Sequence, residues 1–121
     1  MDLSTRDGDG HVVVVLCGEL DMAAAAGVAA ALAAAAAREP RVIVDLAGLR
    51  FIDASGLAAL VRGRKQARHA GGDLLLAAPR HQVLRVLTLT RLTGVFPVHA
   101  SVDEAASSAG RSQRPVLAAG T

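Results

Sequence analysis

The chain has 121 residues, the length of one ordinary domain, and its 13 basic and 11 acidic side chains give a formal net charge of +2. Such a near balance does not favour a nucleic-acid-binding protein, in which basic residues are in clear excess. Hydrophobic residues make up 52% of the chain and aromatic residues only 2%, so the core must consist of Val, Leu, Ile and Ala.

The single cysteine and the apolar segments indicate the compartment. Cys17 has no possible internal disulfide partner, which fits a reducing environment, and its apolar neighbours predict a buried, unreactive thiol. The first residues are polar and acidic, unlike a secretory signal. Residues 22–37 are mostly alanine and fall short of the roughly 20 strongly apolar residues of a membrane span. We therefore expect a cytoplasmic protein without a membrane partner.

The first half of the chain begins with a β-branched run at residues 12–17, typical of a strand buried on both faces. Residues 7–10 have turn chemistry, so the segment before them can pair back as an antiparallel hairpin. Asp21 is placed to cap a helix that continues to about residue 38 and ends before Pro40.

The middle of the chain repeats this order. Residues 41–46 read as a second buried strand, after which the chain passes to a turn at Asp53 and a helix begins. Glycine at position 71 supplies the end of that helix. Arg64 and Arg68 fall towards its apolar side, so we expect their stems to lie along the sheet edge with the charged heads reaching water.

The last third predicts a core strand at residues 73–77, a helix opened by Pro79 and a final strand at 95–98. Pro97 lacks a backbone donor, which restricts that strand to an edge of the sheet. Residues 102–106 can form a last short helix.

These elements predict a single α/β domain over residues 1–109. Its sheet is mixed and largely parallel, with an N-terminal hairpin followed by alternating helices and strands, and about four helices cover it. The order of the strands does not follow from the sequence. Residues 110–121 are expected to form a disordered C-terminal tail.

Metal and cofactor sites are not predicted. The four histidines are scattered, Cys-x-x-Cys is absent, and residues 7–10 lack the remaining oxygen ligands of a calcium loop. No glycine-rich phosphate loop is present, so the chain should not hold a nucleotide. The basic stretch at 62–69 could attract acidic partners, but a solvated helix face explains it better.

Ser55 lies at the turn between the second buried strand and its helix. A hydrolase nucleophile elbow would need glycine where the chain has Asp53 and Leu57. Two interpretations remain, in which Ser55 is either a simple helix N-cap or a phosphorylation site.

The surroundings of Ser55 favour phosphorylation. Free amides and the helix dipole would stabilise a phosphate at the helix start, whereas Asp53, Glu19 and Asp21 would repel it. Opposing terms of this kind can make a reversible switch.

Three segments carry a family resemblance: Gly-Glu-Leu-Asp at 18–21, Val-Ile-Val-Asp-Leu at 42–46 and Phe-Ile-Asp-Ala-Ser-Gly-Leu at 51–57. Together with residues 70–74 and 92–96 they resemble the STAS domain of bacterial anti-sigma factor antagonists over roughly residues 10 to 108. Each motif is weak alone, but their order and spacing are specific.

The resemblance implies a binding protein and not an enzyme. Ser55 matches the serine that a partner anti-sigma factor, itself a serine kinase, phosphorylates in the family. The unphosphorylated form would bind that kinase and free a sigma factor, and a serine phosphatase would restore it, so transcription is controlled without contact with DNA. The implied partner-binding residues lie around this serine: Glu19, Asp21, Asp53, Ala54, Gly56 and Leu57. Ala54 stands where relatives often carry Ser or Thr, which leaves one hydroxyl in the turn.

A second interpretation is a constitutive scaffold, or a STAS domain associated with a transporter or with lipid trafficking, in which Ser55 acts only as a helix cap. The chain is expected to be a monomer or a weak dimer, because an exposed edge strand permits weak self-association.

Overall fold

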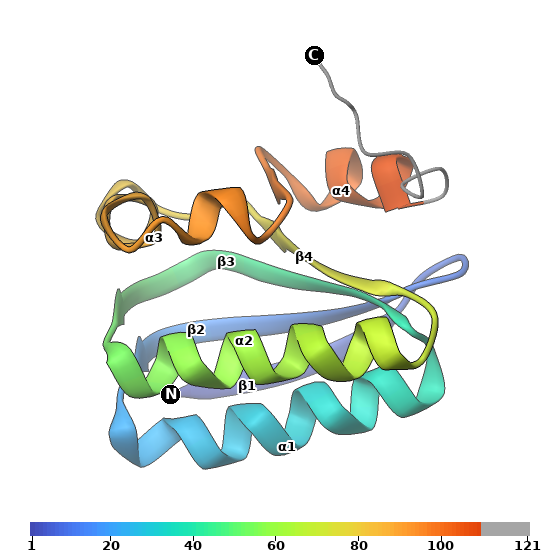
Figure 1. Ribbon diagram of the computed structural model, residues 1–121, viewed down its shortest axis with the longest axis horizontal. Helices are drawn as coiled ribbons and strands as arrows, with labels where there is room; N and C mark the ends of the chain where they lie inside the picture. The colour runs from blue at the N-terminus through green and yellow to red at the C-terminus, as the bar shows by residue number, and fades with distance from the viewer. Residues whose placement is uncertain (110–121) are drawn as a thin grey trace.

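A mixed sheet of five strands forms the centre of the computed structural model, which describes residues 1–109 (Figure 1). The strands lie in sequence order across the sheet: β1 (Asp2–Asp7), β2 (Val12–Leu20), β3 (Arg41–Ile52), β4 (Asp73–Ala77) and β5 (Val98–His99). β1 is antiparallel to β2, and every later pair is parallel. The predicted α/β class and the N-terminal hairpin are confirmed.

Helices cover both faces of the sheet. The described residues hold four α-helices and one 3-10 turn: α1 (Met22–Arg38), α2 (Ala54–His69), α3 (His81–Leu89), η1 (Leu92–Gly94) and α4 (Val102–Ala109). α1 and α2 pack side by side on one face, and α3 and α4 lie on the other (Figure 1). Within residues 1–109 no helix combines the length and the hydropathy that crossing a membrane requires.

The core follows from the alternation of side chains along β2. Val12 and Val14 lie in the large apolar cluster that includes the helix residue Leu32, while Val13 lies in a second cluster with Ala105 of α4. Val12, Val13 and Val14 are all at most 1% exposed. A parallel strand covered by helices on both faces has this uninterrupted apolar sequence.

β3 is longer than the sequence predicts. It was expected to end at Leu46 but continues to Ile52, and its pairing with β2 shifts register twice, between Val15 and Cys17 and between Gly18 and Glu19. Such bulges absorb an extra residue and let the strands stay paired.

Cys17 lies within this irregular stretch and is half-buried, so the prediction of a buried thiol is wrong. Its sulfur packs over Gly48, where an added Cβ would lie 2.5 Å from Sγ.

The last strand also differs from its prediction. Residues 92–94 form η1 and Val95 still has helical backbone angles, φ −97° and ψ −46°. Only Val98 and His99 pair with β4. That strand does lie at the edge of the sheet, as Pro97 requires. The predicted tail, residues 110–121, lies outside the described residues.

The charged heads of Arg64 and Arg68 do not simply reach water. The Nε atom of Arg64 lies 3.2 Å from Oδ1 of Asp73, and Nη1 of Arg68 lies 3.5 Å from Oδ2. The Arg64 and Asp73 side chains are only 24% and 20% exposed. This double pairing attaches the C-terminal half of α2 to the start of β4.

Candidate functional site

The candidate site is built on two equivalent junctions between a strand and a helix. Leu20, the last residue of β2, and Ile52, the last residue of β3, are register partners in the parallel sheet. Each is followed by an aspartate and then by a helix, so Asp21 and Asp53 occupy equivalent positions at the same edge. The Asp53 amide donates to the Leu20 carbonyl over 3.2 Å, which joins the two junctions directly.

Both aspartates cap their helices in the same way. Asp21 has φ −110° and ψ −171° and accepts a hydrogen bond from the Ala24 amide. Asp53 has φ −111° and ψ −173° and accepts one from the Gly56 amide at 3.0 Å. The positive ends of two helix dipoles therefore meet two carboxylates at one end of the molecule.

Ser55 is not the helix cap. Asp53 has that role, so Ser55 is the second residue of α2, and the interpretation of Ser55 as an N-cap is wrong. Its side chain is half-buried, and none of the side-chain hydrogen bonds within residues 1–109 involves its hydroxyl. Asp and Ser are both strong N-cap residues. The extended backbone angles of Asp53 show that Asp53, and not Ser55, is the cap.

The first turn of α2 has few free donors. The Gly56 amide donates to the Asp53 carboxylate, and the Leu57 amide donates to the Asp53 carbonyl at 2.9 Å. The amides of Ala54 and Ser55 are the first of the helix, and no carbonyl four residues earlier within the helix can accept from them. These two amides therefore have no acceptor inside the helix.

Gly56 brings α2 into close contact with the sheet. A Cβ atom at this position would lie 2.6 Å from Leu20 Cγ, 2.7 Å from the Leu20 carbonyl oxygen and 2.9 Å from Ile52 Cγ1. The carbonyl oxygen belongs to the backbone and cannot move aside like a flexible side chain. The position of Ser55 relative to the sheet therefore depends on a glycine here.

The structure separates the predicted partner-binding residues into three groups. Glu19 and Ala54 are exposed, and Asp21 and Asp53 are half-buried caps. Gly56 is buried and Leu57 packs against the core, so these two residues lie on the side of the turn that faces the sheet and not on the surface.

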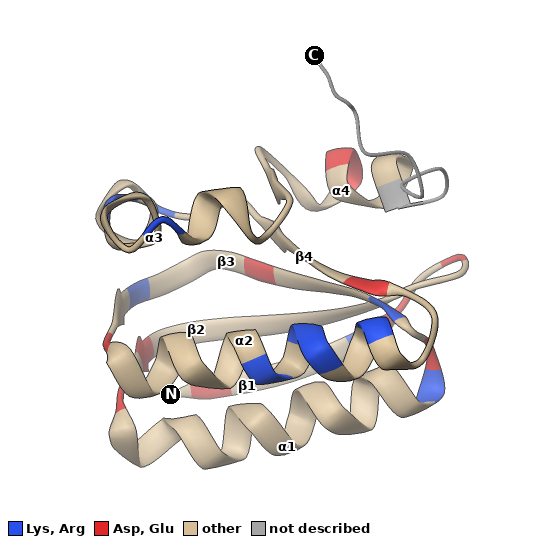
Figure 2. Cartoon of the chain, viewed as in Figure 1, with Lys and Arg blue, Asp and Glu red and all other residues tan. Residues whose placement is uncertain are grey.

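The sequence interpretation missed two neighbours of the acidic groups. Glu19 is the register partner of Phe51, and its carboxylate lies 3.9 Å from Nη2 of Arg50. Both charged side chains are more than half exposed, so this pair is weak. Figure 2 shows acidic residues at these junctions and the basic residues of α2 in its C-terminal half.

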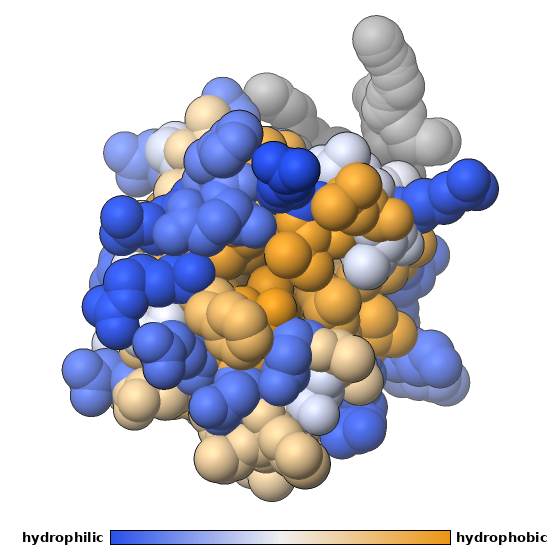
Figure 3. Space-filling model, turned by 90° about the vertical axis from the view of Figure 1, so that its left-hand side faces the viewer, coloured by the Kyte–Doolittle hydropathy of each residue, from blue (hydrophilic) through white to orange (hydrophobic). Residues whose placement is uncertain are grey.

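An apolar area lies on this end of the molecule. Figure 3 views the end that contains the start of α1 and of α2, and hydrophobic surface crosses its centre between polar margins. Two residues at these junctions have exposed apolar side chains: Met22, the first residue of α1, is 76% exposed, and Phe51, near the end of β3, is 49% exposed. Exposed apolar area of this kind typically marks an interaction surface.

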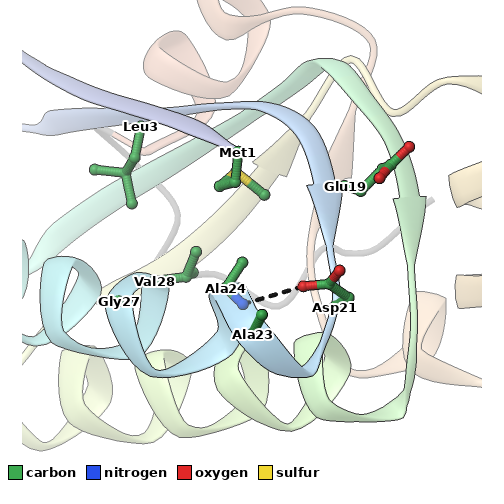
Figure 4. Close-up of a pocket in the computed structure, with 8 residues that line it drawn as sticks. All are labelled: Met1, Leu3, Glu19, Asp21, Ala23, Ala24, Gly27 and Val28. Carbon is green, nitrogen blue, oxygen red and sulfur yellow. Dashed lines mark hydrogen bonds between the residues drawn. The ribbon is translucent and has the colours of Figure 1, made fainter.

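A cavity of about 510 Å³ opens beside the site, between β1 and the start of α1 (Figure 4). Glu19 and Asp21 lie along it with apolar and small residues: Met1, Leu3, Ala23, Ala24, Gly27 and Val28. In the part of the chain that the structure describes, no group of three His, Cys, Asp or Glu residues is placed to hold a metal ion.

Comparison with known proteins identifies the family. Residues 2–105 match the STAS domain. The chain belongs to the STAS domain family. It is 33% identical over 116 residues to BtrV of Bordetella bronchiseptica, described as a candidate anti-sigma factor antagonist, and the match covers 95% of this chain and 99% of that protein.

Solved structures agree with this assignment. An anti-sigma factor antagonist from Mycobacterium paratuberculosis is 26% identical, with a TM-score of 0.81 over 90% of this chain and 93% of that one. The antagonist SpoIIAA in its unphosphorylated form has a TM-score of 0.76 at 24% identity, over 92% of this chain and 97% of that one. SpoIIAA of Bacillus has also been solved in its phosphorylated form, with a TM-score of 0.69 at 23% identity, over 88% of this chain and 97% of that one. The STAS domain fold predicted from the sequence is confirmed.

The packing at Gly56 yields a prediction. Gly56→Ala should lower the free energy of unfolding by about 1–3 kcal/mol, because the added methyl group overlaps the Leu20 carbonyl. Gly27→Ala is the matched control: Gly27 also lies in a helix, no atom lies within 4 Å of its Cβ position, and alanine should raise stability by about 0.5–1 kcal/mol. Urea denaturation measures both. Equal effects of the two substitutions would contradict the close contact.

Proposed function

We propose that this chain is an anti-sigma factor antagonist switched by phosphorylation of Ser55. In its unphosphorylated form it binds an anti-sigma factor that is also a serine kinase, and a sigma factor is thereby freed. Phosphorylation of Ser55 by that kinase ends the complex, and a serine phosphatase restores it. The observation that carries the proposal is the unbonded, half-buried hydroxyl of Ser55 at the start of α2, directly after the carboxylate that caps the helix. The names of the relatives support the class of partner.

Electrostatics at the turn supports a switch. A phosphoserine adds a charge of about −1.5 to −2. The dipole at a helix start favours an anion by about 0.3–1 kcal/mol, but Asp53 already uses the Gly56 amide. Like charges on neighbouring groups repel each other, and this repulsion is stronger near a protein than in bulk water because the effective dielectric constant is lower. The Asp53 carboxylate, two residues before Ser55, opposes this attraction, so we expect the phosphate to point outward into solvent.

An outward phosphate would act on the partner. Ala54 is exposed next to Ser55, and Phe51 and Met22 expose apolar side chains on the same end. A partner that covers this surface must bury the Ser55 side chain. Burying a neutral hydroxyl costs little, whereas desolvating an unpaired dianion costs several kcal/mol. The phosphate thus opposes binding without a change of fold.

The proposed role needs no chemistry from the chain itself. The antagonist is the substrate of its partner kinase and of the phosphatase, and it acts in the cytoplasm with no direct contact with nucleic acid or membrane. The interpretation as a scaffold in which Ser55 serves as the helix cap is weakened, because Asp53 is the cap.

Two serines at helix starts make a matched pair for a test. Ser101 does cap a helix, since its Oγ accepts a hydrogen bond from the Glu104 amide at 3.0 Å. With the cognate kinase and ATP, Ser55→Ala should take up no phosphate and change the free energy of unfolding by less than about 0.5 kcal/mol. Ser101→Ala should take up phosphate like the parent and lose about 0.5–2 kcal/mol of stability. Mass spectrometry and urea denaturation measure the two effects. Stoichiometric phosphate on Ser55→Ala would refute the assigned site.

Charge at position 55 should control binding. Ser55→Asp should weaken binding to the anti-sigma factor kinase at least about tenfold, because it adds a carboxylate beside Asp53 at a surface that the partner desolvates. Ser55→Asn has nearly the same shape without the charge and should bind within about threefold of the parent, well under 1 kcal/mol. Titration calorimetry gives both dissociation constants. Parent-like affinity of Ser55→Asp would refute the charge mechanism.

A further inference from the structure

β1 is an unpaired edge of the sheet. It pairs with β2 on one side only, and all six of its residues are exposed. The opposite edge, β5, has only two residues and follows Pro97. β1 is therefore the one extended edge in residues 1–109 that could accept another strand. Exposed edges of this length pair with other chains unless they are protected.

The charges of β1 are complementary to those of a second copy in one alignment. Asp2 and Arg6 are four residues apart on the same face of the strand, and neither takes part in an ion pair within the described residues. Asp7, in contrast, pairs with Arg38 of α1. If two β1 strands run antiparallel with Ser4 opposite Ser4, Asp2 of each copy lies opposite Arg6 of the other. One alignment thus forms two ion pairs.

Other alignments lose this match. A shift of the pairing by one position in each strand places Asp2 opposite Ser4, or Leu3 opposite Asp7, and no opposite charges meet. If one strand slips by a single residue, each side chain lies opposite one that points to the other face of the sheet. Asp2 and Arg6 of the two copies then no longer meet. The charge pattern therefore specifies the alignment centred on Ser4.

The face of β1 that lies towards α1 supports the same pairing. Met1 is 45% exposed and Leu3 37% exposed, and both line the cavity between β1 and α1 (Figure 4). In the alignment centred on Ser4, Leu3 lies opposite Thr5 of the second copy. The two Leu3 side chains are then diagonal neighbours about 7–8 Å apart, which is within reach of long side chains. The second copy would cover apolar surface that the single chain leaves open.

We propose that β1 is a homodimerisation edge, at which two copies pair antiparallel about Ser4 and form one continuous sheet. Pairing through a six-residue strand buries less than the roughly 1,200 Å² of a stable interface, so the dimer is weak and reversible. Ion pairs at an exposed edge are screened by salt, so the dimer should dissociate as ionic strength rises. This proposal does not depend on phosphorylation of Ser55.

A charge swap tests the proposal. In sedimentation equilibrium up to about 1 mM protein and at low salt, the parent should dimerise with a dissociation constant in the range of 0.1–1 mM, about −5 kcal/mol. Asp2→Arg and Arg6→Asp each place like charges opposite one another twice and should weaken the dimer about tenfold. The double substitution of Asp2→Arg with Arg6→Asp restores opposite charges and should restore the parent value. Arg62→Asp, on the exposed face of α2, makes the same change of charge elsewhere and should have no effect.

Two outcomes would overturn the proposal: a parent that stays monomeric at the highest concentration, or a double substitution no better than the single ones. The alignment has its own test. In a Cys17→Ala background, Ser4→Cys should form a covalent dimer under mild oxidation, because directly opposed Cα atoms lie about 4.5–5.5 Å apart, within disulfide range. Thr5 lies opposite Leu3 of the second copy, so two cysteines at position 5 are only diagonal neighbours. Thr5→Cys should therefore cross-link much more slowly. Equal cross-linking at both positions would refute the alignment.

Discussion

The hydrogen bond from the Gly56 amide to the Asp53 carboxylate fixes the residue at which α2 begins, and the site depends on it. Because Asp53 also donates its amide to the Leu20 carbonyl, the same residue holds the helix start against the end of β2. Gly56 then allows the helix to approach the sheet so closely that a methyl group would overlap the backbone. Ser55 lies between these two constraints, so its hydroxyl is held at a defined place on a rigid element. Placement of this kind suits a modification site, because the added charge appears at the same point of the surface each time.

A second consequence is the concentration of charge at one end of the sheet. The parallel strands β2 and β3 both end there, so both helix starts and both capping aspartates lie together. Glu19 adds a third carboxylate, which Arg50 balances only weakly across 3.9 Å of exposed surface. The basic residues of α2 lie in its other half, where Arg64 and Arg68 pair with Asp73. A phosphate on Ser55 is therefore added where negative charge is already in excess.

Local signals in the sequence predicted much of this structure. The β-branched run, the capping residue Asp21 and the proline after α1 each act over a few residues, and the elements they predicted are present. The length of β3 was missed because bulges depend on pairing with β2, which no local pattern reveals. The choice of cap at α2 was missed for a related reason. Asp53 and Ser55 are both good caps, and only the equivalence of the two strand ends distinguishes them. One signal was present, since Leu-Asp at the end of β2 and Ile-Asp at the end of β3 repeat the same pattern.

The central claim is that a phosphate on Ser55 opposes partner binding through its charge, on a fold that does not change. The most direct test compares the chain phosphorylated at Ser55 with the unmodified chain by titration calorimetry against the anti-sigma factor kinase, with circular dichroism spectra of both. The account predicts at least about a hundredfold loss of affinity, equivalent to about 2.7 kcal/mol, with superimposable spectra. Equal affinity of the two forms, or a loss of affinity accompanied by loss of helical structure, would contradict it.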